Sequence, residues 1–309
     1  MGFFSIFKLK KDKEKPFNKK VKIGLALGGG GARGFAHIGV IKALEEEGLT
    51  FDFVSGTSAG SLVGAMYCAG KTSSEMIDIA KTIKEKDIRT SKILIVPSKT
   101  TGIENIIRNE LGDIDISELK IPFAPVCVDI KSTEEIALRN GNLAKAVAGS
   151  CAVPGIFNPV VFDDRLFSDG GLQNTIPADV PKKFGCDYVL AVDVNSTRAY
   201  GTDSDKVIDV MAASIRILMK SNAIKGYVYG EVIIQPNLKQ YKSTKMNGFM
   251  EMIEEGYRAT KELMPEIREL FTRKPRKKKQ VVPFNENLIV PNDYDINMIR
   301  VDKTNEKDE

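Results

Sequence analysis

The sequence predicts an α/β fold in which a largely parallel central sheet is sandwiched between helices. Residues 21–27 (VKIGLAL) read as a buried strand that breaks into a glycine loop, residues 28–34, and then enters an amphipathic helix ending near Gly48. Residues 51–60 (FDFVSGTSAG) read as a second strand followed directly by a small-residue helix. This strand–loop–helix rhythm is typical of parallel strands joined by covering helices.

The bulk composition is that of a soluble globular protein. The 309 residues are 42% hydrophobic and 28% charged, and the formal net charge of +4 is too small to argue for nucleic acid. The four cysteines are widely spaced and form no C-x-x-C pair, so neither a metal site nor a disulfide framework is predicted. Their apolar neighbours favour buried thiols in a reducing, cytoplasmic compartment.

We expect three regions: an apolar and basic N-terminal tail over residues 1–20, an α/β domain over residues 21–271, and a basic and then polar C-terminal tail over residues 272–309. Neither a signal peptide nor an apolar stretch of membrane-spanning length is expected. The tails are interpreted either as solvated ends or as a peripheral contact with an anionic inner membrane surface, because apolar and lysine-rich residues lie side by side.

More helices and strands follow along the chain. Residues 61–69 form a helix, and Thr72 with Glu75 offers a capping box for another that runs to about Lys86. Residues 87–101 contain the apolar run ILIV, which is interpreted as a short buried segment, a mobile lid or a lipid-facing loop. A helix is expected at 103–111, two neighbouring strands on either side of a turn at 131–133, and a small-residue helix at 143–152.

The second half of the chain supplies the remaining strands. A hairpin in residues 159–171 turns at Asp163-Asp164 and brings Asp169 to the end of a strand. A helix at 178–184, a buried strand at 187–195, a helix at 205–219 and a strand at 231–234 follow. A long amphipathic helix over residues 249–271 is expected to kink at Pro265. The helix at 205–219 places these residues on one face: Val207, Val210, Met211, Ser214, Ile215 and Leu218.

The chemistry centres on Ser58. It lies in a G-x-S-x-G pentapeptide between a strand and a helix, the pattern of a nucleophile elbow, in which a sharp turn exposes the serine hydroxyl. Gly56 and Gly60 allow the tight turn and keep side chains away from an approaching carbonyl group. A serine that transfers acyl groups also needs a base and donors for the oxyanion.

Histidine is not expected to be the base. The only histidine is His37, which precedes Ser58 in the chain, whereas α/β-hydrolases place their histidine last. Asp169 is the remaining candidate, because it ends a strand and the following Gly170 and Gly171 let another loop approach closely. Desolvation in a dry cleft can raise the basicity of an aspartate. The alternative for Asp169 is a turn-stabilising role.

The oxyanion donors are expected in the glycine loop. Gly28, Gly29, Gly30 and Gly31 end one strand and open a helix, so their N–H groups can converge near the positive end of the helix dipole. Arg33 could orient this loop or attract an anionic head group.

The same loop also fits a dinucleotide-binding pattern. Gly29, Gly31 and Gly34 satisfy G-x-G-x-x-G, and Asp52 has about the right spacing for a ribose contact. Asp52 is, however, at the start of the second strand rather than its end. A dinucleotide site also leaves the serine pentapeptide and the Asp-Gly-Gly unexplained. We therefore favour the interpretation in which Ser58 transfers acyl groups.

Taken together, GGGGARG, AHIGV, GTSAG, SCAVPGIFNPV and DGG with downstream Asn174 and Pro177 resemble the patatin-like phospholipases, particularly the bacterial members. The resemblance covers roughly residues 21–195. It implies Ser58 as the nucleophile, Asp169 as the base, and an oxyanion region in residues 28–31 and Arg33, with no histidine, metal or cofactor.

The implied function is hydrolysis of lipid acyl esters. Where the family often has a second asparagine after Asn174, this chain has Thr175. The alternative from another class is a lipid-binding or scaffold protein that keeps the fold with little turnover.

Overall fold

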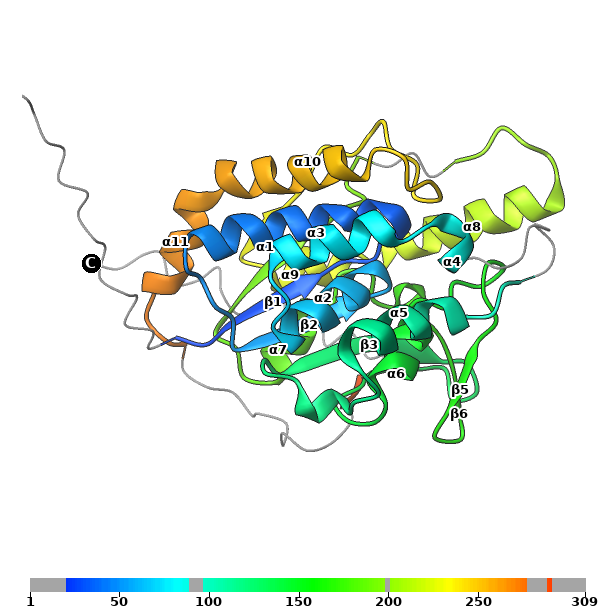
Figure 1. Ribbon diagram of the computed structural model, residues 1–309, viewed down its shortest axis with the longest axis horizontal. Helices are drawn as coiled ribbons and strands as arrows, with labels where there is room; N and C mark the ends of the chain where they lie inside the picture. Colours follow the sequence, from blue (N-terminus) through cyan, green and yellow to red (C-terminus); the bar gives the residue numbers. More distant parts are fainter. Residues whose placement is uncertain (1–20, 89–96, 198–200, 277–287, 291–309) are drawn as a thin grey trace, which may run out of the picture.

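The computed structural model describes residues 21–88, 97–197, 201–276 and 288–290, and its described strands form one nine-stranded sheet between helices (Figure 1). The strand order is β5-β6-β3-β2-β1-β7-β8, with β4 paired to β3 and β9 paired to β4. The strands are β1 Ile23–Leu27, β2 Phe53–Thr57, β3 Phe123–Asp129, β4 Glu134–Ala137, β5 Val160–Phe162, β6 Arg165–Asp169, β7 Tyr188–Val192, β8 Val232–Ile234 and β9 Leu288–Val290.

The middle of the sheet is parallel, as the sequence predicts. Strands β3, β2, β1, β7 and β8 run in the same direction. Leu27, the last residue of β1, is in register with Gly56 of β2 and with Val192, the last residue of β7. The carboxyl ends of these strands therefore meet at one edge of the sheet, where the loops of an α/β protein form its site.

Helices cover both faces of this sheet. The regular and 3-10 helices are η1 Gly31–Phe35, α1 Ala36–Glu46, α2 Ala59–Ala69, α3 Ser73–Thr82, α4 Glu85–Ile88, α5 Thr101–Leu111, η2 Ile116–Glu118, α6 Leu143–Ser150, η3 Gly170–Leu172, α7 Asp179–Lys183, α8 Val207–Ser221, α9 Ile224–Tyr229, α10 Phe249–Glu262 and α11 Met264–Thr272.

Alternate residues of the strands pack against the helix layers on opposite faces of the sheet. Leu25 and Val54 belong to the core that includes residues of α1, α2 and α10, which lie on the same side in Figure 1. Phe53 packs instead with Val180 of α7, and Ala26 packs in the cluster bordered by α9. A strand buried on both faces needs apolar residues at every position, which explains the continuous apolar runs in the sequence.

Several predicted boundaries shift. The capping box of Thr72 and Glu75 is present, but α3 ends at Thr82 and a separate short α4 holds Lys86. The predicted long C-terminal helix is two helices, because Pro265 lies in the first turn of α11, where its missing N–H costs no hydrogen bond. The ILIV run falls largely in residues 89–96, outside the described residues.

The structure adds three features to the expected plan. The apolar periodicity of α8 normally marks a face turned to the core, but here most of that face is exposed. The short helix α9 was not predicted. Within the expected C-terminal tail, residues 288–290 pair with β4 as an antiparallel strand. Among the described helices, none has the length and apolar character needed to cross a bilayer.

Candidate active site

Ser58 makes the turn between β2 and α2. The strand ends at Thr57 and the helix begins at Ala59, so Ser58 itself adopts φ 53° and ψ −124°. A positive φ is rare for a residue with a side chain, and such strain concentrates at functional sites. Ser58 is 6% exposed. This geometry matches a nucleophile elbow.

The amide of this strained residue has a dedicated partner that sequence reasoning missed. The Ser58 N–H donates to Oγ of Ser150 at 3.0 Å, and the Ser150 hydroxyl donates to the Val126 carbonyl at 2.6 Å. Ser150 ends α6 and is fully buried. It therefore ties the elbow to the middle of β3. The only sequence signal was the small-residue composition of that helix.

The glycines of the two motifs stand where a side chain would collide with backbone. A Cβ on Gly56 would lie 2.6 Å from the carbonyl oxygen of Gly60, and one on Gly60 would lie 2.1 Å from that of Leu27. A Cβ on Gly170 would lie 2.3 Å from the Val126 carbonyl oxygen. These contacts are too short for any side chain, so the elbow and the Asp-Gly-Gly turn both require glycine.

Asp169 is brought to the same place by the hairpin β5–β6, which turns at Asp163 and Asp164 as predicted. Both turn residues have positive φ. Asp169 is fully buried and pairs with Cys127 of β3. Its Oδ1 accepts the N–H of Gly171 at 2.8 Å. Its Oδ2 is buried and accepts no well-formed hydrogen bond from the described residues.

The environment of Asp169 suits a base. Burial raises its pKa to about 6, while the Ser58 hydroxyl and the Gly171 N–H lower it in part. Catalytic hydrogen bonds are often long until substrate binds. A carboxylate with a pKa near 6 is ionised at neutral pH and is a stronger base than an exposed aspartate.

The glycine loop lies against the serine, and a Cβ on Gly29 would be 3.3 Å from Cβ of Ser58. The Gly28 N–H donates to the Val192 carbonyl and the Gly29 N–H to the Thr175 carbonyl. Their amides are therefore occupied. The N–H groups of the next two residues, Gly30 and Gly31, donate to no backbone or side-chain acceptor among the described residues.

His37 contacts this loop through its imidazole ring. It is fully buried, and its Nε2 lies 2.8 Å from the carbonyl oxygen of Gly28, which can only accept, so Nε2 carries the proton. Burial lowers the pKa of His37 to about 4, against a smaller rise from the Gly28 bond. The imidazole is therefore neutral. Asn195 holds the next carbonyl, because its Nδ2 donates to Gly29 at 2.6 Å.

Arg33 fixes the outer side of the loop. It is 4% exposed, and its Nε donates to the Tyr241 carbonyl at 2.9 Å. The neighbouring Ala32 N–H donates to the Ser243 carbonyl at 2.8 Å. Both bonds join the loop to the segment between β8 and α10, which supports the orienting role expected for Arg33.

A buried thiol borders the dyad. Sγ of Cys151 lies 3.8 Å from Oγ of Ser61. Burial raises the pKa of Cys151 to about 12, with a further rise from the charge of Asp169, while hydrogen bonds with Ser61 and Ser58 lower it. The thiol is therefore neutral at all physiological pH values. All four cysteines are free and buried, as the sequence indicates.

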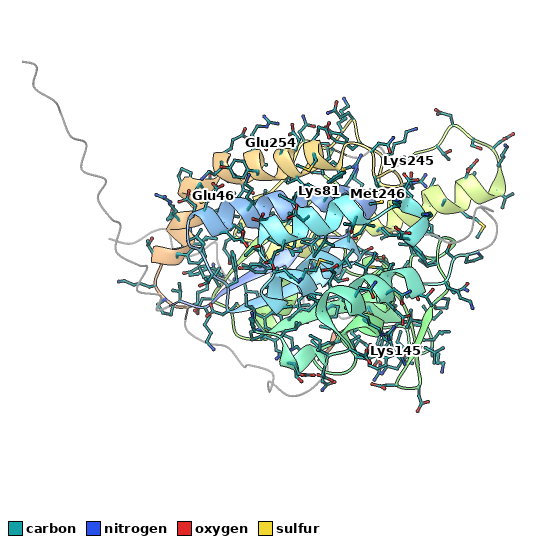
Figure 2. The ribbon with its side chains drawn as sticks, in the orientation of Figure 1. Glu46, Lys81, Lys145, Lys245, Met246 and Glu254 are labelled. Atoms are coloured by element: carbon teal, nitrogen blue, oxygen red, sulfur yellow. The ribbon has the colours of Figure 1, made fainter. Side chains whose placement is uncertain are left out.

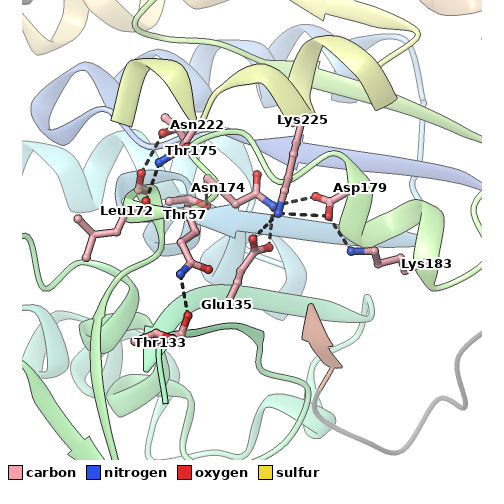
Figure 3. Close-up of polar contacts among 12 residues, drawn as sticks. Thr57, Thr133, Glu135, Leu172, Asn174, Thr175, Asp179, Lys183, Asn222 and Lys225 are labelled. Atoms are coloured by element: carbon pink, nitrogen blue, oxygen red, sulfur yellow. Dashed lines mark hydrogen bonds and ion pairs between the residues drawn. The ribbon is translucent and has the colours of Figure 1, made fainter. Parts of the chain in front are cut away.

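A buried polar cluster anchors the Asp-Gly-Gly turn (Figure 3). The Asn174 side chain donates to Glu135 at 2.8 Å and to Asp179 at 2.7 Å. The backbone carbonyl of Asn174 accepts the Thr57 hydroxyl at 2.8 Å. Lys225 of α9 reaches between the two carboxylates, with its Nζ 2.5 Å from Glu135 and 3.9 Å from Asp179. The cluster thus connects the turn that follows Asp169 to Thr57, the last residue of β2 before Ser58.

The pKa values of the two carboxyl groups in this cluster shift in opposite directions. Burial and then the neighbouring Asp179 raise the pKa of Glu135, against the opposing effect of Lys225. Burial also works to raise the pKa of Asp179, but the charges of Lys183 and Lys225 outweigh it, so that pKa is lowered. Glu135 and Lys225 carry no sequence motif, which is why sequence reasoning did not assign them.

The dinucleotide interpretation finds no support in the geometry. Asp52 accepts the N–H of Ile23 at 2.6 Å, at the amino end of β1, whereas the glycine loop follows its carboxyl end. The acidic residue thus lies at the opposite end of β1 from the loop. Among the described residues, no group of three or more histidine, cysteine, aspartate or glutamate side chains is arranged to hold a metal ion.

Comparison with known proteins finds a family model, related sequences and a solved structure that match this chain. A family model described as patatin-like phospholipase matches residues 25–182, about half of the chain. The neuropathy target esterase sws of Drosophila melanogaster is 31% identical over 270 residues, which cover 76% of this chain and 19% of the fly protein. An uncharacterized NTE family protein of Mycobacterium tuberculosis is 32% identical over 209 residues, 65% of this chain and 57% of that protein.

The chain therefore spans less than two thirds of the length of either relative. Among solved structures, VipD from Legionella pneumophila aligns with a TM-score of 0.47 at 13% identity, over 80% of this chain and 67% of that chain.

Proposed function

Because this chain belongs to the patatin-like phospholipase family, we propose that it hydrolyses acyl esters of lipids through a Ser58–Asp169 dyad. The observation that carries the proposal is the pairing of a strained, turn-borne serine with a fully buried carboxylate whose pKa, about 6, responds to that serine. Oδ1 of Asp169 stabilises the turn through the Gly171 N–H, which leaves the buried Oδ2 for the serine proton.

The proposed reaction begins with attack of the Ser58 Oγ on the ester carbonyl carbon, as Oδ2 of Asp169 takes the hydroxyl proton. The N–H groups of Gly30 and Gly31 then stabilise the tetrahedral oxyanion. Asp169 returns the proton to the leaving alcohol, which leaves an acyl-serine. A water molecule that gives a proton to Asp169 attacks the acyl-serine, and the fatty acid leaves as Asp169 returns that proton to the Ser58 Oγ.

The loop residues on either side serve this arrangement. The Gly28 N–H donates to β7 and the Gly29 N–H donates to Thr175. These two hydrogen bonds would hold the two following N–H groups in place. Arg33 and His37 act through the loop and not on the substrate. Four glycines, one buried arginine and one neutral histidine together would preorganise a small oxyanion site.

An active-site-directed fluorophosphonate tests the proposal. Wild-type protein should be labelled at Ser58, and Ser58→Ala should take up no label while keeping its circular dichroism spectrum. Ser61→Ala is the matched control, because Ser61 is a buried serine one helical turn away, with its hydroxyl committed to the Ser58 carbonyl at 2.7 Å. An unlabelled Ser58 in folded wild-type protein would favour the lipid-binding or scaffold alternative.

The substrate class proposed is the lipid acyl ester, in keeping with the family and with the esterase named among the relatives. A panel of phospholipid, lysophospholipid and glyceride substrates separates the head-group preferences. Failure of folded, unlabelled enzyme that reacts with the fluorophosphonate to release fatty acid from any of them would contradict the lipid assignment but leave the dyad intact. No cofactor is invoked in any step.

A further inference from the structure

An apolar surface lies on α8 and α9, outside the site described above. Its side chains are between 44% and 74% exposed, although each is of a type usually found in a core. We call this surface the α8–α9 face, and its members are Val207, Val210, Met211, Ile217, Leu218, Ile224, Tyr227 and Val228.

The exposed residues of α8 form one stripe. At about 100° per residue, Val207, Val210, Met211, Ile217 and Leu218 fall within an arc of about 120°. The only other described side chains in that arc are serines. The charged residues of the helix lie outside the arc, at positions 209, 216 and 220. A contiguous apolar stripe of this kind on a soluble domain marks an interaction surface.

The opposite side of the same helices packs on the active site. A Cβ on Gly171 would lie 2.3 Å from Cε of Met219, and the Thr175 hydroxyl donates to the Met219 carbonyl at 2.5 Å. Asn222 then bonds the Leu172 carbonyl at 2.6 Å, and Lys225 enters the polar cluster. Whatever binds the α8–α9 face therefore sits one helix thickness from the turn that carries Asp169, and Figure 1 shows α8 projecting from this part of the sandwich.

Positive charge borders the site on its other flank. The segment of residues 235–248 bonds the glycine loop through the carbonyls of Tyr241 and Ser243, and contains no acidic residue. Its Lys239, Lys242 and Lys245 are exposed. Lys245, labelled in Figure 2, also lies 3.8 Å from Glu85. An apolar face that packs behind the Asp169 turn and a basic segment that bonds the glycine loop thus lie on two flanks of the site. Together they complement the acyl boundary and the phosphates of a bilayer.

We propose that the α8–α9 face docks this protein on a phospholipid bilayer, with Lys239 and Lys242 on the phosphate head groups. The inference rests on the proposed function, because the lipid acyl ester must reach Ser58 from that surface. An amphipathic helix at a bilayer places its apolar side at the boundary between head groups and acyl chains. Docking thereby occurs beside the site and does not depend on the basic tails.

Vesicle sedimentation tests the proposal with the full-length chain carrying Ser58→Ala, so that the lipid stays intact. The vesicles contain phosphatidylcholine with a minor share of phosphatidylglycerol. The triple variant Met211→Ser, Ile217→Ser, Leu218→Ser should lower the partition coefficient by about 100-fold, because three large apolar side chains leave the boundary. Lys239→Gln with Lys242→Gln should lower it by about tenfold and flatten its salt dependence.

Val161→Ser is the matched control. Val161 is 67% exposed but lies on the β5–β6 hairpin, so its loss should leave the partition coefficient unchanged. Because the substituted residues of the triple variant are all exposed, its melting temperature should stay within a few degrees of the parent. Unchanged vesicle binding by the folded triple variant would overturn the proposal. So would a wild-type dimer, detected by light scattering, that the triple variant dissociates.

A second readout separates this proposal from the proposed function. With Ser58 restored, the triple variant should hydrolyse a water-soluble short-chain ester at the wild-type rate and vesicle lipid at least tenfold more slowly. If wild-type protein hydrolyses no ester yet binds vesicles through the α8–α9 face, the docking surface stands and the dyad proposal fails. If neutralising the N-terminal lysines abolishes binding while the triple variant binds normally, the docking proposal fails.

Discussion

Replacing Asp169 by asparagine should abolish hydrolysis and at the same time stabilise the protein at neutral pH. The carboxyl is fully buried, and its pKa rises to about 6 from an ordinary 3.8. A folded-state pKa above the unfolded one means that the folded protein binds the proton more tightly. The stability contributed by protonated Asp169 is therefore complete below pH 3.8 and is lost as the pH rises through about 6.

The magnitude follows from the size of the shift. About two pKa units correspond to about 3 kcal/mol of unfolding free energy, of which about 2 kcal/mol falls between pH 4.5 and 7.5. Asparagine has no charge to desolvate, and its carbonyl can still accept the Gly171 N–H. The stability of Asp169→Asn relative to wild type should therefore increase by about 2 kcal/mol across that range.

Urea unfolding at a series of pH values provides the assay, with the difference between the two proteins plotted against pH. Asp129→Asn is a useful control, because burial works to raise the pKa of Asp129 but bonds from Leu166, Lys131 and Ser132 lower it overall, so its dependence has the opposite sign. A difference between Asp169→Asn and wild type that stays flat from pH 4.5 to 7.5 would refute the reasoning. It would mean that Asp169 is solvated and cannot be a strengthened base.

Four further outcomes are expected. Wild-type kcat/KM on a soluble ester should rise with an apparent pKa of about 6, because Asp169 must be ionised to take the serine proton. Ser150→Ala should cost about 1–3 kcal/mol of stability and lower kcat more than it raises KM, because it leaves the buried Ser58 N–H without its acceptor. His37→Gln should lose about 3 kcal/mol less stability than wild type as the pH falls from 6.5 to 4, because the pKa of buried His37 is lowered to about 4 and protonation then favours the unfolded chain. Lys225→Met should cost about 3–5 kcal/mol, because it removes the cation between two buried carboxylates.

Controls and contrary results are specific to each outcome. Ser55→Ala matches Ser150→Ala, because Ser55 is buried and donates to the Pro177 carbonyl at 2.7 Å, but no described N–H donates to it. Equal losses of kcat in the two variants would contradict the role of Ser150. A kcat/KM that does not vary between pH 5 and 7 would argue against Asp169 as base, and parallel pH–stability curves for His37→Gln and wild type would contradict a buried neutral imidazole. Retention of wild-type stability by Lys225→Met would mean that Glu135 takes a proton instead.

Much of the fold could be predicted because local patterns and global packing agree. The continuous apolar runs of β1 and β7 mark strands buried on both faces. The Thr72–Glu75 capping box sets the start of α3 through bonds within four residues. The start of a separate helix at Met264 was harder to predict, because Pro265 is compatible with both a kink and a helix start. Periodicity in α8 indicated a helix correctly, but periodicity does not say what covers an apolar face.

The candidate site divides in the same way. The sequence by itself determined Ser58, Asp169 and the glycine motifs as candidates, since each depends on a short stretch whose backbone requirements exclude other residue types. From chain order, it also predicted that the lone histidine is not the base.

Only the tertiary structure decided which groups meet across the sheet. Ser150 lies 92 positions from Ser58, and Lys225 lies 90 positions from Glu135, yet each pair is within hydrogen-bond distance. The structure also showed that the N–H groups of Gly28 and Gly29 donate to the carbonyls of Val192 and Thr175. The N–H groups of the next two glycines are therefore the candidates for oxyanion donors. The physical reason is that a local motif encodes a backbone conformation. Burial, desolvation and the partner of each polar group depend on segments that only folding brings together.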